Sequence, residues 1–276
     1  MKVVFGIISY LPNKEPNRSL REERLNCPFK NVKNVFGPVD YLIVAQNWGD
    51  YRLPPFVRAK VFRHESGLGI LKARNELRER FLEDGAHWLV MMDDDCIVAE
   101  DAKGAGRRFM SLLANNHGEG FCFRKDETGE YCPSQLNLCA VSRGLYEKEP
   151  LLPVDPERNQ GFEDLIWCNY LHYKYPEMEF DVEGLRCTHF KNPNEKAPST
   201  WADNERRDWQ SMLDFSYGAI EEFRKGNFDW ESIAESASRN GEKTRAAAEA
   251  NADRAARLRE ALFRGWVSAE DAERFK

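Results

Sequence analysis

The chain carries the sequence WLVMMDDD at residues 88–95, a continuous apolar run that ends in three aspartates. Such a run is typical of a strand that is buried on both faces of a parallel sheet. Aspartate is a poor strand former, and three adjacent carboxylates repel one another unless a cation lies between them. The stretch therefore predicts a buried strand whose carboxyl end presents Asp93, Asp94 and Asp95 to a divalent metal ion.

Neighbouring segments predict the sheet around this strand. Residues 2–10, 39–45 and 59–64 are rich in Val, Ile, Phe and Tyr, and we interpret them as strands. Residues 70–84 repeat apolar side chains at helical spacing, and Gly85 follows as a C-terminal cap. Alternating strands and helices favour an α/β fold with a mainly parallel sheet, in which ligands bind at the carboxyl ends of the strands.

The other segments are predicted from local composition. Residues 11–34 are polar, and we interpret them as a loop with one short helix. Residues 231–276 contain twelve alanines and no proline, which predicts a helical tail in the form of a hairpin. We place the domain boundary at residue 200, with a catalytic domain at 1–200 and a helical extension at 201–276. In between, we expect helices at 101–113 and 162–173 and strands at 121–123, 136–141 and 179–188.

Bulk properties exclude several classes of protein. With 276 residues, of which 42% are hydrophobic, the chain can bury a sizeable core. Its net charge of −6 argues against an overall basic surface for nucleic acid. No apolar run approaches the roughly 20 residues that span a bilayer, so we expect no membrane span. Seven cysteines without Cys-x-x-Cys spacing indicate reduced thiols and a cytoplasmic location, or the host cytoplasm for a viral protein.

Three further motifs accompany the aspartates in a characteristic order. LKARN at residues 71–75 precedes them, GFED follows at 161–164, and CTHF lies at 187–190. Together these motifs resemble those of nucleotide-sugar glycosyltransferases of the GT-A fold, which have one Rossmann-like domain and an Asp-x-Asp motif. The resemblance covers residues 1–192 and leaves the helical tail outside.

The resemblance implies a metal site. Asp93 and Asp95 would ligate a Mn²⁺ or Mg²⁺ ion that the donor's diphosphate also holds, and His189 would complete the site. Asp93 and Asp94 would contact the donor, although three consecutive aspartates leave the register open and Asp94 fits as a ligand too. His189 fits equally well as a core or capping histidine.

The resemblance also implies a general base and a donor site. In an inverting transfer Asp164, or else Glu163, would take the proton of the acceptor hydroxyl, although both also suit a helix N-terminus. Arg74 lies one turn into its helix and is placed to bind phosphate or ribose oxygens, unless it is a surface arginine. The polar candidates for the nucleotide, with Trp48 for stacking, are Ser9, Gln46, Asn47 and Asp50.

The sequence leaves the substrates open. The donor would be a UDP- or GDP-sugar, and the enzyme a hexosyl- or pentosyltransferase. The acceptor candidates include a hydroxymethylated base in phage DNA, because residues 14–33 hold six basic and three acidic side chains, although a solvated loop is the simpler reading. Leu258, Leu262 and Trp266 form a narrow stripe on the tail, which would pack on the catalytic domain or form a homo-oligomer.

Three alternatives stay open. A HAD-like phosphohydrolase also uses Asp-x-Asp, but usually near the N-terminus and with Thr or Val where Ile97 stands. A nucleotidyltransferase would normally show a Gly-rich loop with Lys or Arg after the first strand, and the residues after Tyr10 lack such glycines. The third alternative is a protein that binds nucleotide sugars without catalysis.

Overall fold

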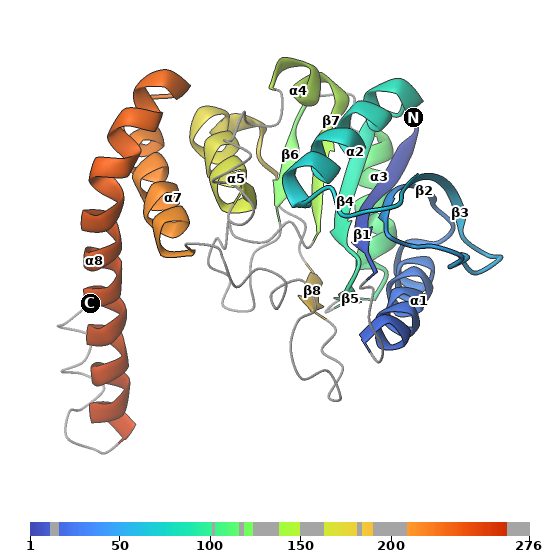
Figure 1. Cartoon of the computed structure of the whole chain (residues 1–276), viewed down its shortest axis with the longest axis horizontal. Coiled ribbons are helices and arrows are strands. Elements are labelled where there is room, and N and C mark those ends of the chain that lie inside the picture. The colour runs from blue at the N-terminus through green and yellow to red at the C-terminus, as the bar shows by residue number, and fades with distance from the viewer. Residues whose placement is uncertain are drawn as a thin grey trace. The chain divides into compact units, whose positions relative to one another are not determined.

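The structure is a computed structural model that describes residues 1–11, 17–100, 103–115, 119–123, 138–149, 163–180, 184–189 and 209–263. The chain folds as two compact units, Met1–Asp208 and Trp209–Lys276 (Figure 1). Within the described residues, no helix combines the length and apolar character needed to cross a bilayer. That the first unit is catalytic and the second an extension stays a prediction.

A six-stranded sheet forms the centre of the first unit, in the order β3-β2-β1-β4-β7-β6 (Figure 1). The first four of these strands are parallel, and β7 and β6 add an antiparallel edge. The mainly parallel α/β fold that the sequence predicts is therefore confirmed. The strands are β1 (Val3–Tyr10), β2 (Asp40–Gln46), β3 (Arg58–His64), β4 (Trp88–Asp93), β6 (Phe121–Phe123) and β7 (Cys139–Ser142).

The helix α2 (Ile70–Asp84) packs on one face of the sheet. It ends at Gly85, whose φ of 74° is the left-handed conformation expected of a C-terminal cap. The helix lies close to β1, because a Cβ atom added to Gly6 would come within 2.8 Å of the Leu77 side chain. Glycine at this position of β1 therefore lets α2 pack directly on the central strand.

On the other face lies α1 (Asn17–Phe36), which contacts α3 (Ala105–Asn115). Our prediction of a loop with one short helix was wrong, because α1 runs for 20 residues with Pro28 inside it. Leu25, Phe29 and Val32 are each at most 1% exposed and recur at helical spacing, so they form a buried stripe. In the sequence, the charged residues before Leu25, together with Lys30 and Lys33, hid this stripe.

A second, two-stranded sheet follows the aspartates directly. It pairs β5 (Cys96–Glu100) with β8 (Leu185–His189) in antiparallel register, so that Cys96 lies opposite His189. The sequence prediction missed β5 and began the next helix at residue 101, whereas α3 begins at Ala105. The rest of the unit contains α4 (Arg143–Lys148), α5 (Glu163–Lys174), which the sequence predicted, and the 3₁₀ turn η1 (Pro176–Met178).

The second unit consists of α7 (Trp209–Arg224) and α8 (Trp230–Phe263). The two helices form an antiparallel hairpin, since Gly218 meets Ala237 and Gly241 meets Asp214 at backbone distance. The helical tail is thus confirmed through Phe263, but α8 is one long helix and not a hairpin in itself. The predicted stripe of Leu258, Leu262 and Trp266 lies outside the described side chains.

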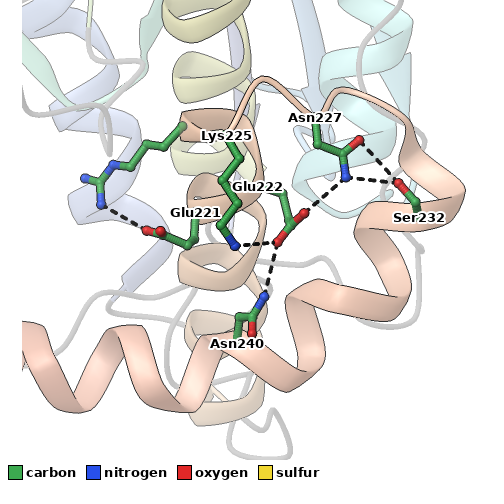
Figure 2. Close-up of polar contacts among 7 residues, drawn as sticks. Glu221, Glu222, Lys225, Asn227, Ser232 and Asn240 are labelled. Carbon is green, nitrogen blue, oxygen red and sulfur yellow. Dashed lines mark hydrogen bonds and ion pairs between the residues drawn. The ribbon is translucent and has the colours of Figure 1, made fainter.

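A polar cluster closes the hairpin, as Figure 2 shows. The Glu222 carboxylate accepts hydrogen bonds from Asn227 at 3.1 Å, from Lys225 at 3.0 Å and, across the helix pair, from Asn240 at 3.1 Å. These donors, Asn227 first and Lys225 next, hold the pKa of Glu222 below its usual value. The cluster ties the loop between the two helices to α8.

Candidate functional site

The three aspartates lie where β4 ends, at the carboxyl edge of the parallel sheet. Asp93 is the last residue of β4 and pairs with Ile8 of β1, Asp94 and Asp95 form a turn, and Cys96 begins β5. The ends of β1 and β2 lie at the same edge, because all of these strands are parallel. This edge is where open α/β sheets bind their ligands.

The pleat of β4 sends neighbouring aspartates toward different helices. Side chains alternate along a strand, and Trp88, Val90 and Met92 face the core that contains the α1 residues. Asp94 continues this set and contacts Arg21 of α1, whereas Asp93 points to the other face and lies near Arg74 of α2. Two residues that look equivalent in the sequence therefore have different surroundings.

Burial separates the three carboxylates in the same way. The Asp94 side chain is 5% exposed, while those of Asp93 and Asp95 are 28% and 23% exposed. Burial raises the pKa of Asp94 to about 6, with Asp95 and Asp93 adding to the rise and Arg21 and a hydrogen bond from Ser9 opposing it. Asp93 and Asp95 are thus the carboxylates that a ligand can reach.

The Arg74 guanidinium is buried beside Asp93. Its side chain is only 8% exposed, and Nη2 lies 3.7 Å from Asp93 Oδ1. Arg74 is therefore not a surface arginine, and the structure brings this predicted donor-binding residue to the aspartates. Its contact with phosphate or ribose oxygens stays a prediction.

Arg21 is a second buried arginine at the site, and the sequence prediction missed it. Its Nη2 donates to Asp94 Oδ1, and its Nη1 lies 3.7 Å from Asp95 Oδ2. We had counted it among the basic residues of a solvated loop. The signal that could have found it is its position four residues before Leu25, on the buried stripe of α1.

A divalent cation fits between Asp93 and Asp95. One oxygen of each carboxylate and the Cys96 sulfur lie within 4.8 Å of one another. Carboxylate oxygens suit Mg²⁺ and Mn²⁺. Cys96 is fully buried, and a hydrogen bond with Cys187, together with burial, raises the pKa of its thiol far above the usual value. Because Mg²⁺ and Mn²⁺ prefer carboxylate oxygens to sulfur, we count the two carboxylates, and not the thiol, as the fit to the metal.

For the other predicted site residues, the structure describes the position of the backbone but not the side chains. His189 is the last residue of β8 and pairs with Cys96, the residue that follows Asp95. The backbone of His189 therefore lies beside the proposed metal site. Glu163 and Asp164 are the first residues of α5. The roles of these three residues as ligand and base stay predictions.

The predicted nucleotide contacts divide into buried and exposed residues. Ser9 is 2% exposed, and its Oγ accepts a hydrogen bond from Trp48 Nε1 at 3.2 Å. Trp48 is itself buried and packs edge-on against Tyr51, so its ring offers no face to a base. Gln46 accepts a hydrogen bond from the Leu68 backbone at 2.6 Å, which shapes the loop before α2.

Asp50 and Asn47 lie in the turn after β2. Asp50 is exposed, and within the described residues no contact joins it to the aspartates. Asn47 has a φ of 56° and donates to the Leu11 carbonyl at 2.6 Å, so it serves the turn itself. Donor binding by Ser9 and Asp50 stays a prediction.

Comparison with known proteins shows the fold. No protein-family model and no curated protein sequence matches this chain. Among solved structures, S. aureus TarS 1–349 in complex with UDP-GlcNAc is similar with a TM-score of 0.53 and 10% identity, over 85% of this chain and 70% of that one. The mannosyltransferase PcManGT from Pyrobaculum calidifontis, in complex with GDP-Man and Mn²⁺, matches with a TM-score of 0.48 and 14% identity, over 96% and 82%. The chain thus shares the α/β fold of TarS.

Proposed function

We propose that this chain is a metal-dependent glycosyltransferase that moves a sugar from a nucleotide-diphosphate sugar to an acceptor hydroxyl. The observation that carries the proposal is the pair of accessible carboxylates, Asp93 and Asp95, at the carboxyl edge of the sheet with buried Arg74 beside them. Carboxylates that hold a cation next to a guanidinium suit a diphosphate, which binds both. The fold shared with TarS, which was solved with UDP-GlcNAc, supports a UDP- or GDP-sugar as the donor.

In this proposal Asp93 and Asp95 hold Mn²⁺ or Mg²⁺. A bound cation would neutralise negative charge on the leaving diphosphate. His189 is the proposed third ligand, because the β5–β8 pairing puts its backbone opposite Cys96. Arg74 would bind a phosphate or ribose oxygen of the donor from the α2 side. Ser9 and Asp50 are the proposed contacts to the rest of the donor.

The proposed base acts at the start of α5. Asp164, or else Glu163, would take the proton from the acceptor hydroxyl while its oxygen attacks the anomeric carbon. The bond between that carbon and the diphosphate breaks on the opposite face, so the configuration inverts. The support is the order of these two residues along the chain, after the metal motif and at the start of α5.

The acceptor is left open in this proposal. The basic residues that made DNA a candidate acceptor do not all lie on one exposed surface. Arg21 faces the core, whereas Lys30 and Lys33 of α1 are exposed. The HAD-like alternative is less favoured by the sheet, because its aspartates would follow β1, whereas the aspartates here follow β4. A cytoplasmic location and a hexosyl or pentosyl group are proposed as before.

A thermal-shift panel tests the proposal. Wild-type protein is melted with UDP- and GDP-sugars, with and without Mn²⁺, beside the Asp93→Asn/Asp95→Asn double variant. Saturating donor at 100 times its Kd should stabilise the wild type by about 2.7 kcal/mol, only when Mn²⁺ is present. Glu79→Gln, which removes an exposed acid of α2, should behave like the wild type. If none of the UDP- or GDP-sugars raises the melting temperature of the wild type in the presence of Mn²⁺, the proposal is contradicted.

A further inference from the structure

Arg21 occupies an unusual place on α1. It lies on the same face as Leu25, Phe29 and Val32, which are buried in the core. Arginine is rarely found on a buried face unless it is paired. The helix is held firmly against the strand after the aspartates, because the Asn31 side chain donates to the Val98 carbonyl and accepts from its N–H, both at 2.8 Å. A guanidinium fixed on this helix is fixed relative to β5 as well.

The two arms of the guanidinium reach consecutive aspartates. Nη2 donates to Asp94, which is buried, and Nη1 lies 3.7 Å from Asp95, which is accessible. Asp95 lies in the turn between β4 and β5, where no strand pairing orients its side chain. Arg21 of α1 is thus a contact that orients the Asp95 carboxylate.

We infer that Arg21 is a positioning residue of the metal site, which holds Asp94 inward and Asp95 in the orientation that lets it ligate together with Asp93. The inference rests on the metal site of the proposed function. Removing a partner that orients a metal ligand typically lowers metal affinity 10- to 100-fold, and Arg21 contacts Asp95 as an ion pair at 3.7 Å. Arg21 therefore contributes to Mn²⁺ affinity through geometry and not through its charge, which by itself opposes a cation.

Two variants separate geometry from charge. Three carboxylates and the guanidinia of Arg21 and Arg74 give the site a charge of −3 + 2 = −1. Arg21→Lys keeps this charge, but a single ammonium cannot span both aspartates as the planar guanidinium does. Arg21→Gln/Asp94→Asn also keeps it, at −2 + 1 = −1, and leaves no buried charge without a partner should the lysine variant fail to fold.

The experiment measures Mn²⁺ alone binding to the full chain, by the electron paramagnetic resonance signal of free Mn²⁺. Both variants should raise the Kd by at least about tenfold. The control is Leu25→Ala, one turn along the same buried face, which loosens α1 without touching the aspartates. Its melting temperature should fall while its Kd for Mn²⁺ stays within about threefold of the wild type.

The outcomes are distinct. A wild-type Kd in either folded variant would overturn the positioning role and leave the metal site standing. An equal rise in Leu25→Ala would also overturn it, because the effect would then be a general loosening of α1. A wild type that binds no Mn²⁺ would overturn the proposed metal site, and the role of Arg21 with it.

Discussion

Gly241 of α8 allows the sharpest prediction, because its contact with α7 can be given a magnitude. A Cβ atom at this position would lie 1.6 Å from the Asp214 carbonyl oxygen, whereas real Cβ atoms essentially never approach closer than 3.0 Å. Gly241→Ala must therefore move the two backbones apart by at least 3.0 − 1.6 = 1.4 Å at this point. A gap of about 0.5–1 Å already loses a quarter to a half of the dispersion energy of the atoms that line it.

Two terms of opposite sign decide the result for Gly241→Ala. Alanine in a helix interior is favoured over glycine by about 0.5–1 kcal/mol. Overpacking a tight interface costs about 1–3 kcal/mol, and the contact here is with rigid backbone and not with a side chain that could rotate away. We expect a net loss of about 1–2 kcal/mol in the free energy of unfolding of the hairpin.

Urea unfolding followed by circular dichroism at 222 nm measures this loss. The control is Glu235→Ala, at an exposed position of the same helix, which should change stability by less than about 0.5 kcal/mol. Mn²⁺ binding should be unchanged in Gly241→Ala, because the proposed ligands all belong to the first unit. A Gly241→Ala protein as stable as the wild type would refute the close backbone contact.

Two further predictions concern the base and the pH dependence of stability. Asp164→Asn should lose at least about 10²-fold in turnover while donor binding, followed by thermal shift, is nearly kept; if only Glu163→Gln is inactive, the assignment within the pair is wrong. The lowered pKa of Glu222 means that its ionised form stabilises the fold above the unfolded pKa of about 4.3, and that this contribution is lost as the pH falls through the folded pKa. Glu222→Gln should therefore lower the melting temperature at pH 7, and this deficit should shrink as the pH falls through the folded pKa of Glu222; a deficit that does not change with pH would contradict this.

The sequence by itself determined the parallel sheet and the edge at which the aspartates lie. Continuous apolar runs mark β1, β2 and β4 because strands covered on both faces need apolar side chains on both. The helical spacing before Gly85 predicted α2, and the aspartates at the end of β4 predicted the position of the site. These features are local, so neighbouring residues are enough to predict them.

Only the tertiary structure decided which of the three aspartates are buried and which are accessible. Which face of β4 meets α1 and which meets α2 depends on packing between distant segments, and this choice turns Asp94 inward and leaves Asp93 and Asp95 accessible. The role of Arg21 also needed the structure, because helical spacing can put Arg21 on the same face as Leu25 but cannot show which segment that face meets. The pairing of β5 with β8 joins segments some ninety residues apart, as in Cys96 and His189. Such long-range contacts leave no periodic signal in the sequence, because each partner satisfies its own local preferences without the other.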